Sequence, residues 1–372
     1  MGDVGYNPTI CTNTPPHLRD RKRTKPHLTD DTVLNQYLTI SGDTYSCVDF
    51  YKQPAFDHPA LQNHSYHPDI EFDSFPLKNI SQINSWISKL WANGEGCPIG
   101  TVPIRKYTKS EFISTLNLFR KLYPTDEPVR GRFRSCVHTL NGEHTFHGGS
   151  AAFSIYNFPV GAEQYSASYQ IIRKAEDQLQ FGWTINPIMY KDGQTRIFLT
   201  TKVEKTRCFN QMCGGFILAT KDVPLDLVLP NTTHRGDKHS VELVVKMVRE
   251  ADSKRWSLRS KNDFVIGYWP DEVLKGLQGP AEYLEWGGEA FNPPDKGLKG
   301  PPMGSGFFPV GFGARDGYAS QLRRYDSAGA GSMIGGDETE MYSDDNSLYR
   351  VLDGGFIDKE FGHMAYFGGA GA

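Results

Sequence analysis

Short runs in which apolar and polar residues alternate dominate the chain from about residue 133 onward. A period of two is typical of β-strands with one buried face. We expect strands at 151–156, 165–173, 179–186, 196–203, 214–219, 240–248, 256–260 and 264–269, and a short helix at 271–277. Turn residues such as Asp192-Gly193 lie between the runs. This spacing predicts an all-β fold, an antiparallel β-sandwich.

The preceding part of the chain has a different pattern. Residues 80–91 and 109–122 carry apolar side chains at helical spacing, so each range predicts an amphipathic helix. Pro124 and Pro128 end the second helix and mark a linker. The sandwich is therefore expected to follow a smaller mixed domain.

Three regions result from these patterns: a disordered tail at 1–45, a small domain at 46–130 and the sandwich at 131–372. The tail holds a basic run at 19–25, for which a solvated tail is a simpler interpretation than an import or anion-binding signal. In the linker, Arg130, Arg132 and Arg134 suggest either a processing site or a solvated loop. Residues 326–372 are rich in Gly and Asp, and we assign no element there.

The charge balance excludes some partners. The 372 residues include 40 Lys and Arg against 43 Asp and Glu, a net charge of −3, so the molecule as a whole is not suited to nucleic acid or to an anionic membrane. No run of 18 apolar residues is present, and residues 1–6 contain no apolar signal core. The sequence taken literally predicts either a cytosolic protein or a missing true start.

The cysteines instead favour an oxidising compartment. Cys208 and Cys213 enclose a short loop that suits a disulfide better than zinc, because no second ligand pair follows. Cys47 and Cys97 are candidates for a second disulfide, whereas Cys11 and Cys136 have no obvious role. Glycosylation sequons begin at Asn63, Asn79 and Asn231.

Several kinds of chemistry lack support. The sequence contains no nucleotide-binding glycine motif, no His-Glu-x-x-His and no Gly-x-Ser-x-Gly. Ser305 lies between glycines, for which a tight turn is the simpler explanation. His58, His64 and His67 have no metal-binding partners at a regular spacing. Nothing in the sequence requires a metal or an organic cofactor.

Acid–base catalysis remains as a candidate chemistry, and its candidate residues lie in two Gly-Trp segments. Glu285 and Glu289 flank a Trp and two glycines, and a carboxylate against an indole is partly desolvated. Gln180 precedes a second Gly-Trp step. If Gln180 and Glu289 face one cleft, the carboxylate can take a proton from water and the amide can donate to an oxyanion. The alternative is two ordinary strands with surface polar residues.

These segments belong to a longer set of matches. The chain resembles the plant neprosin family of glutamic peptidases, first associated with cleavage next to proline. Similar segments are 47–59, 100–105, 181–190, 208–216, 267–270, 286–289 and 303–306. The resemblance implies a β-sandwich, secretion, an inhibitory activation peptide at 46–130, two catalytic glutamates and a protein or peptide substrate. It leaves the oligomeric state open.

The resemblance places one catalytic glutamate at Glu289, with Glu285 as the alternative if the register differs. The second catalytic acid would stand at position 180, where this chain has Gln180; Glu176 and Asp177 are the nearest acids upstream. Candidate substrate-binding residues are Trp183, Tyr190 and Trp286. A late cysteine pair that the family often carries is absent from this sequence.

Two functions therefore stand as hypotheses. The eqolisins, another glutamic peptidase family, resemble this arrangement in using a Gln/Glu pair, so Gln180 can serve as a donor that does not titrate. This favours a secreted acid endopeptidase made as a zymogen. The alternative is an inactive relative that binds proteins or wall polymers through the same cleft.

Overall fold

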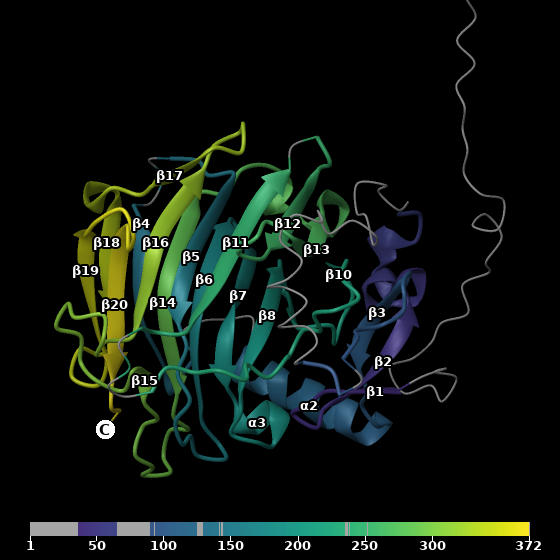
Figure 1. Ribbon diagram of the computed structural model, residues 1–372, viewed down its shortest axis with the longest axis horizontal. Helices are drawn as coiled ribbons and strands as arrows, with labels where there is room; N and C mark the ends of the chain where they lie inside the picture. Colours follow the sequence, from purple (N-terminus) through teal and green to yellow (C-terminus); the bar gives the residue numbers. More distant parts are fainter. Residues whose placement is uncertain are drawn as a thin grey trace, which may run out of the picture.

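Three antiparallel sheets make up the computed structural model (Figure 1). It describes residues 36–64, 90–92, 94–124, 129–140, 142, 144–234, 237, 239–250 and 252–371. Two large sheets form the predicted sandwich, and a small sheet stands beside them at the right of Figure 1.

The first large sheet has seven strands. In spatial order they are β18 (Thr339–Ser343), β4 (Arg132–Thr139), β14 (Tyr283–Phe291), β6 (Tyr165–Lys174), β7 (Asp177–Ile185), β8 (Thr195–Val203) and β9 (Thr206–Phe209). A short helix, α3 (Pro187–Tyr190), follows β7. The side chain of Asn186 caps α3, and Pro187 occupies its first turn, where a missing N–H costs nothing.

The second large sheet has ten strands. Its main order is β10 (Ile217–Leu218), β13 (Val265–Pro270), β12 (Arg255–Arg259), β11 (Glu242–Glu250), β5 (Gly148–Ser154), β16 (Tyr318–Tyr325), β20 (His363–Gly369) and β15 (Met303–Gly304). Strand β17 (Gly331–Met333) pairs with β16, and β19 (Arg350–Phe356) pairs with β20.

The remaining elements form a unit that we call the small unit, residues 36–124 as far as they are described. It contains β1 (Gln36–Leu38), β2 (Thr44–Asp49), β3 (Thr101–Arg105) and α2 (Lys109–Leu122). Thr108 and Glu111 form a capping box that starts α2 at the predicted residue. The buried positions Thr115, Phe119 and Leu122 have the spacing of one helix face.

A continuous apolar core lies between the two large sheets. Trp183, Trp256, Trp269 and Trp286 are completely buried in it. The small unit contributes to the same core, for example through Phe50. It is therefore packed onto the sandwich and not tethered beside it.

Several expectations differ from the structure. Residues 36–45, which we assigned to the tail, form β1 and the start of β2 because the small sheet and the sandwich give them partners. Only Ile217–Leu218 of the range 214–219 is a strand, and 271–277 holds two 3-10 turns in place of one helix. Four strands fall in the range 326–372. Residues 1–35 and 80–89 lie outside the described residues, as do Cys11, His67 and Asn79.

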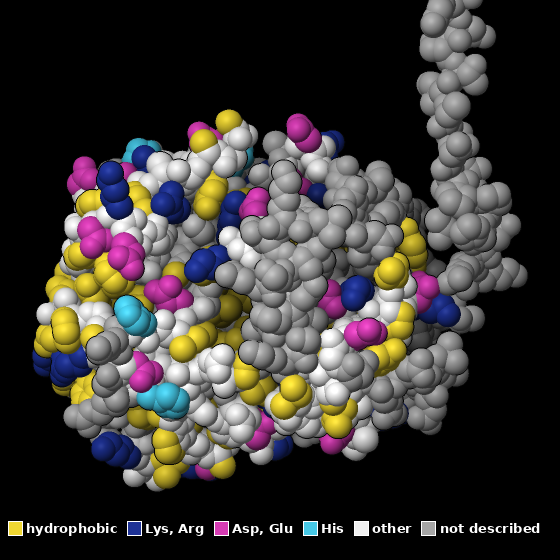
Figure 2. All heavy atoms as spheres, viewed as in Figure 1, with side chains coloured by type: hydrophobic (Ala, Val, Ile, Leu, Met, Phe, Trp, Pro, Cys, Tyr) yellow, Lys and Arg dark blue, Asp and Glu magenta, His cyan; other side chains and the backbone are white. Residues whose placement is uncertain are grey.

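Acidic and basic side chains are interspersed over the described part of the face shown in Figure 2. No described helix has both the length and the apolar character needed to cross a membrane.

Candidate active site

The candidate residues lie on the outer face of the seven-stranded sheet, on the side away from the ten-stranded sheet. Paired residues of antiparallel strands point to the same face. Gln180 on β7 pairs with Ile171 on β6, which in turn pairs with Glu285 on β14. Glu289 shares this face because it is four residues further along β14.

Gln180 and Glu289 lie on the same face of the sheet but in different rows of residues paired across the strands. Strand spacing places the Cα atoms of Gln180 and Glu285 about 10 Å apart and those of Gln180 and Glu289 about 16 Å apart. Tyr169 and Gly182 lie in the row between the two glutamate rows. Register therefore brings Glu285 closer to Gln180 than Glu289, and both glutamates are buried on this face.

The two carboxylate oxygens of Glu289 have different partners. Tyr165 donates from its hydroxyl to Glu289 Oε1 at 2.5 Å. The other oxygen, Oε2, lies 3.7 Å from Arg132 Nε, which is longer than a hydrogen bond. Burial, followed by the charge of Glu289, raises the pKa of Tyr165 well above its ordinary value. Tyr165 thus remains a neutral donor that orients the carboxylate.

Glu285 is bonded on both oxygens. Tyr169 donates to Oε1 at 2.7 Å and Tyr283 donates to Oε2 at 2.5 Å. Burial, followed by the charge of Glu285, raises the pKa of the nearby Cys136 thiol well above its usual range. Two donors, one on each oxygen, satisfy this buried carboxylate, which suits a structural role better than proton transfer.

Gln180 is oriented by one neighbour. Thr200 donates from Oγ1 to Gln180 Oε1 at 2.8 Å. Since the amide oxygen is occupied, the NH₂ group is the end left to donate elsewhere. The nearby acids do not replace it: Asp177 accepts from the backbone N–H groups of Lys275 and Leu277, and Glu176 is an exposed partner of Lys202.

The glycine of the first Gly-Trp step is required by the backbone. A Cβ at Gly182 would lie 1.9 Å from the carbonyl oxygen of Ser168 on the neighbouring strand. The close approach of β6 and β7 therefore excludes any side chain at this position.

The tryptophans of both steps occupy a different place from the one we expected. Trp183 and Trp286 are fully buried between the sheets and donate from Nε1 to Ser154 O and Gln170 Oε1. An odd number of residues separates each from its candidate polar residue, so the rings point to the opposite face. They stabilise the core and do not line the outer face.

Tyr190 lies at the contact between the sandwich and the small unit. Its ring is covered by the guanidinium groups of Arg105, 5.4 Å from the ring centroid, and Arg196, 4.9 Å away. A cavity of about 360 Å³ between α2 and α3 adjoins it.

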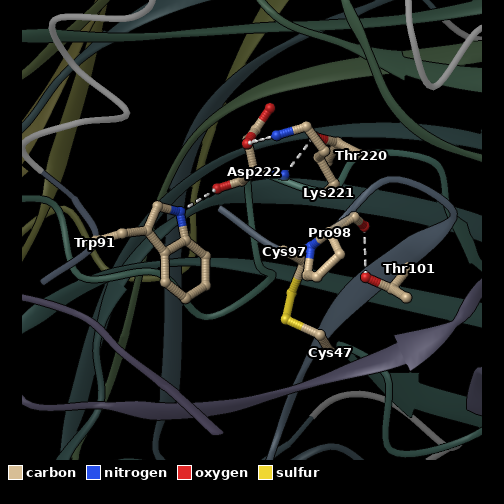
Figure 3. Close-up of a disulfide and its surroundings, with 8 residues drawn as sticks. All are labelled: Cys47, Trp91, Cys97, Pro98, Thr101, Thr220, Lys221 and Asp222. Carbon is tan, nitrogen blue, oxygen red and sulfur yellow. Dashed lines mark hydrogen bonds and ion pairs between the residues drawn. A yellow bond between two sulfur atoms is a disulfide. The ribbon is translucent and has the colours of Figure 1, made fainter. Parts of the chain in front are cut away.

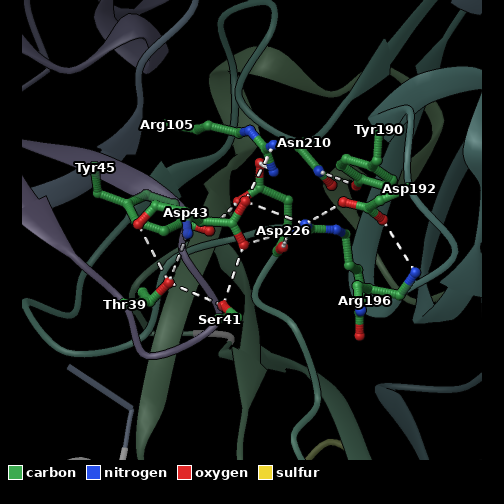
Figure 4. A network of polar contacts seen from close by, with 11 residues as sticks. Thr39, Ser41, Asp43, Tyr45, Arg105, Tyr190, Asp192, Arg196, Asn210 and Asp226 are labelled. Atoms are coloured by element: carbon green, nitrogen blue, oxygen red, sulfur yellow. Dashed lines mark hydrogen bonds and ion pairs between the residues drawn. The ribbon is translucent and has the colours of Figure 1, made fainter. Parts of the chain in front are cut away.

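That contact contains a buried cluster of charges (Figure 4). Arg196 Nη1 bonds to Asp43 Oδ2 at 2.7 Å, and Arg105 bonds to both Asp43 and Asp226. Tyr45 donates to Asp226 Oδ1 at 2.8 Å. Burial raises the pKa of Asp226 to about 6 against the pull of the two arginines. Asp43, Tyr45 and Arg105 come from the small unit, so the cluster joins it to the sandwich.

Rings cover the outer face next to Glu289. Tyr123, which follows α2, stacks on Tyr165 with ring centroids 5.5 Å apart, and Phe119 of α2 lies 5.4 Å from Phe209. These side chains form one buried cluster with Phe198 of β8. The small unit therefore closes the face that carries the candidate residues.

Two further contacts fix the small unit. Gln53 bonds to both backbone groups of Leu218 on β10, which satisfies the edge of the ten-stranded sheet. The predicted disulfide Cys47–Cys97 is present, and Cys97 N donates to Lys221 O at 2.9 Å (Figure 3). The second predicted disulfide, Cys208–Cys213, follows β8.

The remaining residues named from the sequence lie in a turn, on the surface or at the start of β4. Ser305 lies in a turn closed by a bond from Gly306 N to Met303 O. Asn63 and Asn231 are exposed. Of the three predicted linker arginines, Arg130 is exposed, whereas Arg132 and Arg134 belong to β4 and Arg132 is buried beside Glu289.

Residues that sequence reasoning missed carry most of this site: Tyr165, Tyr169, Tyr283, Cys136 and Thr200. Each is more than 15 residues from its partner in sequence, except Tyr283, which is two residues from Glu285. The period of two could have placed Tyr165 and Tyr169 on one face of β6, but not opposite β14.

Comparisons with known proteins agree with the predicted family. Residues 162–370 match the family model described as Neprosin, and residues 37–146 match the one described as Neprosin activation peptide. The first match alone spans more than half of the chain.

Solved structures show weaker likenesses. A scytalido-glutamic peptidase with a transition state analog inhibitor has 10% identity over 64% of this chain and 98% of that chain, with a TM-score of 0.35. SCP-B, a member of the Eqolisin family of peptidases, has a TM-score of 0.34 at the same identity and the same shares of both chains. A toad ovary galectin has 11% identity over 42% of this chain and 93% of that chain, with a TM-score of 0.24. Likenesses at this level carry no argument about the site.

Proposed function

Because this chain belongs to the neprosin family, we propose that it is the zymogen of an acid endopeptidase in which Gln180 and Glu289 carry out the hydrolysis. The observation that supports Glu289 over Glu285 is its bonding: among the described residues, Glu289 Oε2 has an ion pair with Arg132 at 3.7 Å but no hydrogen-bond donor, whereas tyrosine hydroxyls donate to both oxygens of Glu285.

In this proposal Glu289 Oε2 takes a proton from water, and the resulting hydroxide attacks the scissile carbonyl carbon. The NH₂ group of Gln180 donates to the oxygen that becomes negatively charged. The C–N bond then breaks, and Glu289 returns its proton to the leaving amine. Tyr165 holds the carboxylate in position throughout.

The pH dependence follows from the residue types. Two catalytic carboxylates would share a proton and titrate as a coupled pair. An amide does not titrate, so Glu289 alone sets the activity profile of this chain. A profile with two coupled acidic groups that are both lost in Glu289→Gln would contradict the Gln/Glu assignment.

The small unit acts as the inhibitory part of the zymogen. It covers the outer face through Phe119 and Tyr123 and is joined to the sandwich by the charge cluster. Substrate can reach Glu289 only after this cover moves or is cut, and exposed Arg130 is a candidate cleavage position.

Secretion and proline specificity are parts of the same proposal. Two disulfides and two exposed sequon asparagines, Asn63 and Asn231, support a secretory compartment, extracellular or vacuolar. Cleavage beside proline comes from the family resemblance alone.

The test is digestion of a proline-containing peptide library by acid-treated full-length protein from strongly acid to neutral pH. Glu289→Gln should lose cleavage, Gln180→Ala should lose most of it, and Glu285→Gln should keep the pH profile if it folds. Cleavage retained in Glu289→Gln and lost in Glu285→Gln would assign the reaction to Glu285. Absence of cleavage at every pH, even in Gln180→Glu, would favour the non-catalytic binding protein.

A further inference from the structure

The ring of Tyr123 occupies a defined place beside the proposed catalytic carboxylate. Tyr123 is 3% exposed, and its ring stacks on Tyr165 at an interplanar angle of 24°. Phe291 stacks on Tyr165 at 5.5 Å and 11°. Tyr123 therefore lies against an aromatic platform that the sandwich supplies.

The hydroxyl end of the Tyr123 ring also lies near charged side chains of the sandwich. Burial raises the pKa of Tyr123, and the charges of Glu289, Arg132 and Arg207 act on its hydroxyl. Tyr165 in turn donates to Glu289 at 2.5 Å. Tyr123 thus contacts Tyr165, which in turn contacts the carboxylate that would activate water.

The wall that Tyr165 forms stays with the sandwich when the small unit leaves. Tyr165 belongs to β6 and stacks on Phe291 of β14, whereas Phe119, whose ring centroid lies 5.1 Å from that of Tyr123, leaves with α2. Removal of the small unit would leave an apolar ring site with a polar end next to Glu289. Exposed aromatic surface of this kind is costly in water and favours an occupant of similar shape.

We infer that this ring site is a substrate subsite for an aromatic side chain, tyrosine above all, and that Tyr123 fills it in the zymogen as a substrate residue would. The inference rests on the proposed peptidase function, because a substrate subsite requires a substrate. It adds a preference for an aromatic side chain to the proposed preference for proline.

A binding experiment tests the site without requiring catalysis. Tyr123→Ala empties the ring site in the full-length protein, and N-acetyltyrosinamide is then titrated by NMR, with N-acetylleucinamide as the control ligand. We expect binding of the tyrosine derivative to Tyr123→Ala, about tenfold weaker binding of the leucine derivative, and no binding to wild type. Equal binding of both ligands, or none by a folded variant, overturns the inference. If Tyr123→Ala does not fold, Tyr123→Leu replaces it.

A cleavage experiment tests the functional part. Acid-treated wild-type protein is given peptides that differ only in Tyr, Phe, Leu or Ala at single positions beside the cut. At one position we expect kcat/KM to be about tenfold higher for Tyr and Phe than for Leu. Cleavage without such a preference overturns the subsite while leaving the peptidase proposal intact. If no peptide is cut, the peptidase proposal fails and the binding experiment alone decides the site.

Discussion

The small unit contacts the sandwich through buried charges at one place and through stacked rings at another. Asp43 and Arg105 meet Arg196 and Asp226 in the charge cluster, whereas Phe119 meets Phe209 beside the candidate site. A buried ion pair needs every partner in place, because one unpaired charge in the interior is costly. Ring packing depends on shape and is insensitive to pH. The cluster therefore makes docking selective and pH-dependent, while the rings determine what lies over Glu289.

The titration of Asp226 makes docking of the small unit stronger in acid, which is the opposite of release by acid. The pKa of Asp226 is about 6 in the docked state, against an ordinary value of 3.8. Below about pH 3 Asp226 is protonated in both states and costs nothing. Above about pH 7 its charge in the cluster costs about 3 kcal/mol. Docking through Asp226 is therefore tighter in acid and weakens as pH rises through 6, so acid does not release the small unit through this residue.

Removal of Arg196 should have one of the two largest effects. Arg196→Met leaves Asp43 buried without its closest partner, and we expect the free energy of unfolding to fall by about 3–5 kcal/mol. Arg130→Met is the matched control, because its pair with Asp295 is exposed and should contribute little. Denaturant unfolding measures both. Equal losses in the two variants would show that the cluster is not a major stabilising contact.

Phe119→Ala breaks the aromatic contact. Phe119 is fully buried, so the cavity should cost about 3–5 kcal/mol, with the same loss at pH 5 and pH 7.5. Ile113→Ala, on the same helix but 49% exposed, is the control. A loss that changes strongly with pH would contradict the division between the two contacts.

Asp226→Asn should remove the pH dependence of docking. We expect amide hydrogen exchange in β2 to be slower at pH 4.5 than at pH 7.5 in wild type, because docking is about 2 kcal/mol stronger at the lower pH. Intrinsic exchange rates are subtracted, and the difference should vanish in Asp226→Asn. Faster corrected exchange in acid would mean that other groups open the cluster.

A charge pair remote from the small unit gives the smallest effect. His363 Nε2 lies 2.6 Å from Asp353 Oδ1; the Asp353 bond raises the pKa of His363 against the opposing effect of burial, and the His363 bond lowers that of Asp353. Stability from this pair is present between the two pKa values and is lost as pH rises through that of His363. His363→Gln should thus lower Tm more at pH 5.5 than at pH 8.5. An equal drop at both values would indicate lost packing alone.

Local patterns predicted much of this fold. The helical spacing of 109–122 gave α2 with its bounds, and alternation located β6, β7 and β8 within a few residues. The same alternation separates Gln180 from Trp183 by three residues, which already implies opposite faces of one strand. The alternation that predicted the strand could therefore also have assigned Trp183 to the core.

Register across strands was not available from local patterns. Glu289 and Tyr165 are 124 residues apart, and their contact depends on how β14 pairs with β6. The charge cluster likewise joins residues more than 100 positions apart. Such contacts are fixed by the assembled sheets, so the sequence could name Gln180 and Glu289 but not the tyrosines that bond to the carboxylates.

The most direct test compares acid-treated wild-type protein with Glu289→Gln and Glu285→Gln on one peptide library, with folding checked by circular dichroism. The account predicts a loss of cleavage of at least 100-fold in Glu289→Gln, in the range typical of a missing general base. It predicts an unchanged pH profile in Glu285→Gln. Full activity in a folded Glu289→Gln variant would contradict the account.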